Sequence, residues 1–226
     1  MVLLMKKRTY LLIIFYLIVL AAPGACFAQE TENACDEIAE VLTRLEHNMS
    51  EIKSISSGFV QEKDLALFKN RLLIKGFVYL KKPDLLAWYV TEPLRYKVVI
   101  KGDTIAQWDE ETDKTQKISI KKNPALQAVF EQMNKWFSGA YSSMTSEYRI
   151  MLLSRAPVSF RFIPKEGTYA HNAISSVTVV FRDDERYIQK IEIKEKTGDF
   201  TNIRFINTLL NGIIADTAWE LKPSVQ

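Results

Sequence analysis

Two segments of the chain repeat their apolar residues with the period of a helix. The first runs from Asp36 to Ile55, and its apolar positions follow the spacing of one helix face: Ile38, Val41, Leu42, Leu45, Met49 and Ile52. The second opens at Asn123-Pro124, a capping residue followed by proline at the first helical position, and Gly139 suits its end. Its apolar face consists of Leu126, Val129, Phe130, Met133 and Phe137. We therefore expect two amphipathic helices.

Elsewhere the apolar period changes to two, which is typical of strands. From Ser57 to Ile120 four to six strands fit, with turns at Lys82-Pro83-Asp84, Lys101-Gly102-Asp103 and Glu110-Glu111-Thr112-Asp113. Six more strand segments follow the second helix: SEYRIMLL, VSFRFIP, SVTVVF, YIQKIEIKE, DFTNIRFI and TAWELKP. The pattern predicts a mainly β domain of α+β type, an antiparallel sheet of about ten strands that curls, with the two helices over its concave side.

The hairpin from Gly76 to Pro93 departs from this alternation. Its two strands carry apolar residues on both faces, in FVYL and LLAWYV. A half-buried strand needs only one apolar face. One face of the hairpin therefore belongs to the core, and the other must be covered by something else.

The N-terminus is typical of an export signal. Lys6, Lys7 and Arg8 precede an apolar run from Leu11 to Ala22, and small residues follow in APGACFA. Twelve apolar residues are too few to span a bilayer, which takes about 20. We expect residues 1–28 to be a signal peptide cleaved after Ala28, which leaves residues 29–226 as one domain exported to the periplasm. The alternative is a lipoprotein that is cut before Cys26 and carries its lipid on that cysteine.

Removal of this segment changes the charge of the chain. The 226 residues contain 30 Lys plus Arg and 27 Asp plus Glu. Residues 1–28 hold three basic residues and no acidic one, so the mature chain has 27 minus 27, a net charge of zero. This balance argues against nucleic acid as a partner, because nucleic acid requires clustered positive charge. Only Cys35 would remain, so no disulfide could form within the chain.

Catalytic patterns are weak along the sequence. His47 and His171 are far apart and form no metal-site spacing with Cys35, and all eight glycines are isolated. The chain has no nucleophile elbow of the G-x-S-x-G type. The pair Asp183-Asp184 falls in an expected hairpin turn, where aspartate is favoured for backbone reasons. We expect a protein that is not an enzyme and has no cofactor or metal, while a hydrolase with an unrecognised triad remains the alternative.

The order of motifs along the chain resembles the LolA family of periplasmic lipoprotein carriers. That family shows F-x-Q-x, then G-x-L-x-V-K-R-P-x-x-F-x-W, then D-G-x-x-L-W-x-Y. Phe59 and Gln61 match the first motif, and Gly102 and Ile105 match the third. The second motif is matched by Gly76, Lys81, Pro83 and Trp88. The segment FTNIRFINTLLNGIIADTAWELKP resembles the closing strands of the family, in which phenylalanine commonly stands at Trp219.

The resemblance implies an incomplete antiparallel β-barrel with amphipathic helices as a lid over an apolar cavity. It implies a monomeric carrier that shields acyl chains of lipoproteins and takes them from an inner-membrane donor complex to an outer-membrane acceptor. By register with the family motif, the residues expected to face this cavity are Val78, Leu80, Leu86, Trp88 and Val90, with Phe130 and Met133 from the second helix. Lys82 stands where the family has a basic lid latch.

Two departures from the family pattern leave the cargo open. The latch residue is usually arginine, and lysine lacks its planar fork of donors. Leu86 replaces a usual phenylalanine. The alternatives are therefore a carrier or accessory protein for another acyl lipid, such as an aryl-polyene or glycolipid, and an acceptor of the same fold anchored through Cys26.

Overall fold

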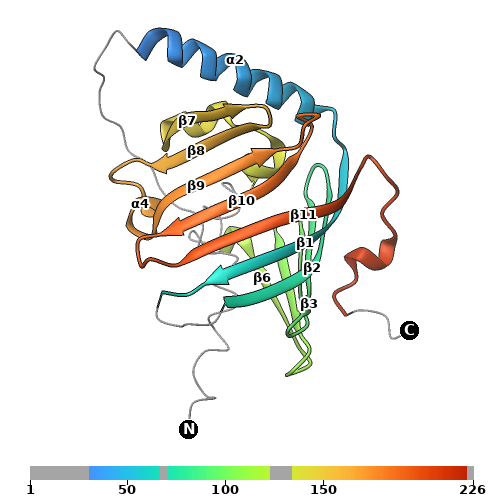
Figure 1. The fold of residues 1–226 in the computed structure, drawn as a ribbon. Coiled ribbons are helices and arrows are strands. Elements are labelled where there is room, and N and C mark those ends of the chain that lie inside the picture. The colour runs from blue at the N-terminus through green and yellow to red at the C-terminus, as the bar shows by residue number, and fades with distance from the viewer. Residues whose placement is uncertain (1–30, 67–70, 123–133, 223–226) are drawn as a thin grey trace.

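The computed structural model describes residues 31–66, 71–122 and 134–222, and its centre is one antiparallel sheet of eleven strands (Figure 1). The strand order across the sheet is β6-β5-β4-β3-β2-β1-β11-β10-β9-β8-β7. The strands of the first half are β1 (Ser54–Asp64), β2 (Arg71–Lys81), β3 (Leu85–Glu92), β4 (Tyr96–Lys101), β5 (Thr104–Asp109) and β6 (Lys114–Ser119). Those of the second half are β7 (Tyr148–Arg155), β8 (Val158–Pro164), β9 (Ile174–Phe181), β10 (Ile188–Glu195) and β11 (Phe200–Leu210).

The sheet is a barrel that does not close. Each half is a meander of neighbouring antiparallel strands, and the pairing of β1 with β11 joins the two halves. The edge strands β6 and β7 stand at opposite ends of the order and do not pair with each other. The curled, incomplete antiparallel barrel expected from the sequence is therefore confirmed, with eleven strands in place of about ten.

One long helix, α2 (Thr31–Ser50), lies across this sheet (Figure 1). Its apolar stripe enters the core, with Val41, Leu42, Leu45 and Met49 all buried. The expected range of 36–55 was wrong at both ends, because the helix stops at Ser50 and β1 starts at Ser54. Ile52 is fully buried as expected, but it lies in the connection, where its N–H donates to the carbonyl of Met49.

Shorter helical pieces complete the described chain. Residues 134–138 are helical and end at Gly139, whose φ of +86° explains why glycine stands there. The start of this expected helix, with Asn123 and Pro124, lies outside the described residues. The remaining pieces are η1 (Ile120–Lys122), η2 (Ser142–Ser146), α4 (Tyr169–Ala173) and η3 (Asp216–Trp219).

The inner face of the hairpin β2–β3 is buried, whereas its outer face is covered only in part, with Phe77 43% exposed. The main hydrophobic core contains the five hairpin residues expected to face the cavity: Val78, Leu80, Leu86, Trp88 and Val90. Ala87 is equally buried but points to the opposite face, together with Val99 on β4 and Trp108 on β5. Something must therefore cover the outer side of these strands.

That cover is the C-terminal strap, which we define as residues 211–222. Trp219 packs edge-on against Tyr79 of β2 with ring centroids 6.4 Å apart. Lys97 of β4 donates to the carbonyl of Thr217 at 3.3 Å, and Lys222 pairs with Asp113 beyond β5. The expected strand TAWELKP was therefore wrong over its described residues, 217–222: they form the end of η3 and an irregular segment that lie on the sheet rather than within it.

Candidate functional site

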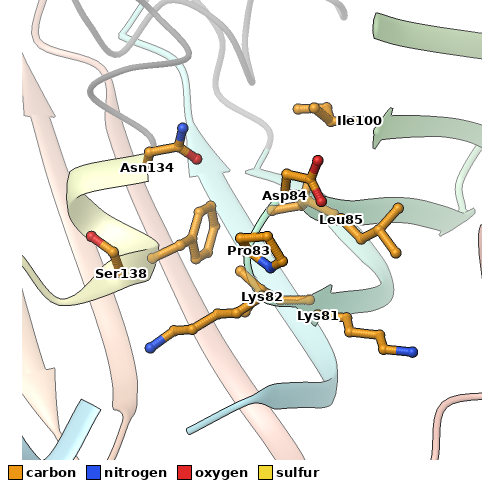
Figure 2. Close-up of a pocket in the computed structure, with 11 residues that line it drawn as sticks. Lys81, Lys82, Pro83, Asp84, Leu85, Ile100, Asn134 and Ser138 are labelled. Carbon is orange, nitrogen blue, oxygen red and sulfur yellow. The ribbon is translucent and has the colours of Figure 1, made fainter. Parts of the chain in front are cut away.

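The candidate site lies at one end of the barrel, between the β2–β3 turn and the helical residues 134–138 (Figure 2). A cavity of about 200 Å³ opens there. It is lined by Leu80, Lys81, Lys82, Pro83, Asp84, Leu85, Leu86, Ile100, Asn134, Phe137 and Ser138. We call this end of the barrel the mouth.

Strand register explains the apolar floor of the cavity. Leu80 on β2 is paired with Leu86 on β3, and Leu86 is paired with Ile100 on β4. The three side chains therefore form a cross-strand row on the inner face of the sheet. Phe137 adds an aromatic ring from the helical segment. Polar groups from Asn134, Ser138 and Asp84 stand around this floor (Figure 2).

Lys82 connects the turn to the long helix. Its ammonium group donates a hydrogen bond of 2.6 Å to the carbonyl oxygen of Met49, in the last turn of α2. Carbonyls at a helix C-terminus lack partners within the helix and carry partial negative charge, so they attract a cation. Partial burial lowers the pKa of Lys82 below its ordinary value, because desolvation disfavours the charged form.

Met49 is the residue at which the two helical segments and the turn meet. A β-carbon built on Gly139 would come within 2.6 Å of the Met49 side chain, so the end of the second helix lies directly against α2. The carbonyl of the same methionine accepts from Lys82. Movement of α2 away from the mouth would therefore break both contacts.

Trp88 lies two residues beyond Leu86 on the same inner face. Its ring stacks on Phe59 of β1 with centroids 4.3 Å apart. Gly76 makes this contact possible, since a β-carbon there would lie 2.8 Å from the Phe59 ring. The indole N–H of Trp88 is buried and has no hydrogen-bond partner within the described chain. A buried donor without a partner is costly, by about 1–3 kcal/mol.

The structure separates the residues expected at the site into three groups. Leu80, Leu86 and Lys82 surround the mouth cavity. Val78, Trp88 and Val90 face the same interior but contribute to the core rather than to the cavity wall. Phe130 and Met133 lie outside the described residues. The part that each of these side chains takes in binding stays a prediction.

Sequence reasoning missed Ile100 and the partner of Lys82. The alternation in YKVVIK, read together with the adjacent turn at Gly102, could have placed Ile100 beside Leu86. Nothing in the sequence singles out the carbonyl of Met49, because every residue has a carbonyl and only the ending of the helix frees this one.

His171 lies among backbone hydrogen-bond partners, whereas His47 is exposed to solvent. His171 lies in α4, where its backbone N–H donates to the side chain of the capping residue Thr168, and its Nδ1 lies 3.3 Å from the carbonyl of Pro164. His47 is exposed on α2. In the described ranges, no three His, Cys, Asp or Glu side chains gather as a metal site. None of the described helices is long and apolar enough to cross a membrane.

Comparison with known proteins agrees with this architecture. The family described as "Outer membrane lipoprotein carrier protein LolA" matches residues 50–222. An outer-membrane lipoprotein carrier protein of Francisella tularensis subsp. tularensis (strain WY96-3418) is 24% identical over 184 residues, which cover 81% of this chain and 84% of that protein.

Solved structures share the fold at lower identity. An uncharacterized conserved protein from Thermus thermophilus superposes with a TM-score of 0.51 at 10% identity, covering 84% of this chain and 97% of that one. MucB superposes with a TM-score of 0.51 at 14% identity, covering 82% of this chain and 62% of MucB. Because the family match spans most of its length, this chain belongs to the LolA family of outer membrane lipoprotein carrier proteins.

Proposed function

We propose that residues 29–226 form a periplasmic carrier that shields the acyl chains of lipoproteins and delivers them from the inner to the outer membrane. Residues 1–28 would direct export and then be removed. A donor complex in the inner membrane would load the carrier, and an acceptor at the outer membrane would unload it. Membership of the family and the carrier named among its relatives support this assignment.

The observation that carries the proposal is the construction of the mouth. Leu80, Leu86, Ile100 and Phe137 form an apolar cavity, and Lys82 fastens α2 beside it through a hydrogen bond to Met49. Pockets that enclose a whole ligand usually measure about 300–1,000 Å³. A cavity of about 200 Å³ is therefore too small for a long acyl chain unless the helices move outward.

Energetics explain why such a carrier needs a lid and a partner at each membrane. Each buried methylene is worth about 0.8 kcal/mol, so a chain of roughly 16 carbons costs on the order of 12 kcal/mol to expose to water. Release into water is therefore too slow to be useful. Transfer requires an acceptor that takes the chain as it leaves, and closure of the lid favours departure because it competes with the cargo for the same apolar interior.

Lipid extraction tests the proposal directly. The protein is purified from the bacterial envelope without detergent, and its organic extract is analysed by mass spectrometry. We expect acylated peptide or lipid in the extract and saturable binding of a fluorescent fatty acid by the delipidated protein. Absence of both would exclude a carrier role. The intact mass from the same preparation shows whether the chain begins at Gln29 or carries acyl groups on Cys26.

A further inference from the structure

Two large apolar side chains at the mouth end point into solvent. Leu209, near the end of β11, is 66% exposed, and Ile213, in the loop that follows, is fully exposed at 103%. Hydrogen bonds fix the start of this loop. Asn211 accepts from the N–H of Lys53 at 2.6 Å, donates to the carbonyl of Glu51 at 3.1 Å, and gives its own backbone N–H to Ser54. These hydrogen bonds hold Asn211 in place two residues before Ile213, whose side chain is fully exposed.

Strand register places this loop beside the cavity. Ser54 donates its hydroxyl to the carbonyl of Gly212 and is paired with Lys81 on β2. Lys81 is paired with Leu85, which lines the cavity and is paired in turn with Lys101 on β4. One row across the sheet thus connects the exposed loop, the cavity wall and two lysines.

The same end carries unpaired positive charge. Lys53, Lys81 and Lys101 are exposed, and none of their ammonium groups has a hydrogen bond or ion pair in the described chain. The nearby acidic groups without an ion pair are Glu51 and Asp84, while Asp103 is neutralised by Lys121. In the adjoining β9–β10 turn Asp184 and Glu185 are paired with arginines, while Asp183 and Arg186 carry opposite charges and form no ion pair in the described chain. With Lys82 included, four lysines face two free carboxylates, and Asp216, three residues after Ile213 in the strap, is a third carboxylate without an ion pair in the described chain.

We propose that the mouth rim, defined as Lys53, Lys81, Lys101, Leu209 and Ile213, docks on the surface of an anionic lipid bilayer. Exposed aliphatic side chains beside lysines are the combination that binds the bilayer interface: the apolar groups enter the headgroup boundary and the ammonium groups lie against lipid phosphates. Ile213 protrudes singly from a pinned loop rather than lining a groove, which suits a deformable lipid surface better than a shaped protein partner. The inference rests on the proposed function in one respect, because docking by this end would bring the cavity opening to the membrane.

Vesicle flotation tests the inference with the exported protein. Binding to phosphatidylcholine vesicles is compared with binding to vesicles that also contain phosphatidylglycerol, and we expect clear binding only to the latter, weakening as salt is raised. Combining Lys53→Gln, Lys81→Gln and Lys101→Gln should reduce it on the order of 100-fold, at roughly fivefold per lysine. Combining Leu209→Ser and Ile213→Ser should reduce it by about tenfold or more.

Matched controls lie at the opposite end of the barrel. Leu94 is 53% exposed in the β3–β4 turn, and Lys194 on β10 is exposed in the row that ends at Arg71. Leu94→Ser and Lys194→Gln should leave vesicle binding unchanged. Loss of binding in these controls equal to that of the rim variants, or full binding by the rim variants, would overturn the inference. Equal binding to both kinds of vesicle would do so too.

Fatty-acid binding in solution separates this inference from the proposed function. The variant that combines Leu209→Ser and Ile213→Ser should bind fluorescent fatty acid as the wild type does and keep its thermal transition, because both side chains are exposed and neither lines the cavity. If the wild type binds fatty acid but no vesicle, the carrier role stands and the rim contacts an acidic protein instead. If the wild type binds anionic vesicles through the rim but no fatty acid, the proposed function fails and the docking surface stands.

Discussion

Lys82 stabilises the mouth through a single strong contact rather than through an ion pair. Its described partner is the carbonyl oxygen of Met49 at 2.6 Å, and no carboxylate of the described residues lies within ion-pair distance of it. A hydrogen bond from a charged donor contributes about 1.5–3 kcal/mol. Such a contact is strong enough to hold a helix end in place, and weak enough for an incoming acyl chain to displace.

Lys82→Leu should therefore make the carrier hold its cargo too tightly. Without the hydrogen bond, closure of the lid no longer competes with the bound chain, so dissociation of a fluorescent fatty acid should slow by about 10- to 100-fold. Stopped-flow transfer of the probe to acceptor vesicles measures this rate. Lys194, which is exposed at the opposite end of the barrel, provides the control, since Lys194→Leu should leave the transfer rate unchanged. A wild-type transfer rate in Lys82→Leu would refute the latch.

Gly76 is a second position that matters at the residue scale, because the packing there leaves no room for a β-carbon. An alanine β-carbon there would lie 2.0 Å from the carbonyl oxygen of Tyr89 and 2.8 Å from the ring of Phe59. Neither neighbour can move freely, because the first is backbone in β3 and the second stacks on Trp88.

We expect Gly76→Ala to lower the free energy of unfolding by about 3 kcal/mol or more, above the usual range for overpacking. Denaturant unfolding measures the loss. Gly212→Ala is the matched change, because its β-carbon would meet only Leu209 at 3.9 Å. That variant should unfold within about 0.5 kcal/mol of the wild type, and equal losses in the two variants would contradict this account of Gly76.

At the scale of elements, the C-terminal strap covers part of the apolar outer face of the central strands, while Phe77 on that face stays 43% exposed. Lys97 shows how it is attached: the residue is 3% exposed, donates to Thr217 and lies over the ring of Tyr89 at 5.5 Å. Burial lowers the pKa of Lys97, and the negative charge of Glu220 opposes this only partly. The cationic form of this lysine is therefore a cost to the folded state, which packing of the strap offsets.

Lys97→Met should relieve that cost without opening the strap, because methionine fills similar space without a charge. The folded pKa is lower than the unfolded value of about 10.4, so between the two the unfolded chain binds more protons and wild-type stability rises with pH. The variant should be the more stable protein below the folded pKa, and its advantage should shrink as pH rises through this window. Unfolding measured from neutral to alkaline pH checks the trend, and an advantage independent of pH would contradict it.

The elements that sequence predicted well are those specified by neighbouring residues. The turns at Lys82-Pro83-Asp84, at Gly102 and at Asp113 all lie where turn chemistry placed them, and the strand VSFRFIP has the bounds of β8. The predictions that were wrong concern residues whose structure depends on contacts with residues far away in the sequence. Ile52 continues the spacing of α2, yet it is buried outside the helix, and TAWELKP alternates like a strand but rests on the outer face of the sheet. Both outcomes depend on tertiary packing rather than on local pattern.

At the scale of the whole molecule, the two halves of the sheet are packed differently. Near β7–β9 the interior is filled by contacting aromatic rings, among them Trp136, Tyr148, Phe162, Tyr141 and Phe181. The side chains that β2, β3 and β4 place on the inner face at the mouth are aliphatic, and the mouth cavity opens beside them: Leu80, Leu86 and Ile100. We therefore expect the aromatic half to contribute more to stability and the half around the cavity to be the one that changes when a ligand enters.

Leu86→Glu distinguishes a ligand cavity from an ordinary core. A carboxylate sealed in a core without a partner costs several kcal/mol, which is much of the stability of a domain this size. Leu86 is 6% exposed but lines the cavity, so water can reach the new carboxylate once the mouth opens slightly. We expect a folded protein with a cooperative thermal transition, a modest loss of stability and greatly reduced binding of fluorescent fatty acid, because the acyl chain would have to desolvate the charge.

The matched change is Val179→Glu, at a residue with 0% exposure on the inner face of β9 that does not line the cavity. That variant should unfold or fail to accumulate, because its carboxylate has no route to water. Circular dichroism shows whether each variant folds, and the fatty-acid titration shows whether Leu86→Glu still binds. If Leu86→Glu unfolds as Val179→Glu does, the side chain of Leu86 belongs to a sealed core. If it folds and binds fatty acid as the wild type does, the acyl chain lies elsewhere in the barrel. Only a folded protein that has lost binding places the cargo against Leu86, at the mouth beside the hydrogen bond from Lys82 to Met49.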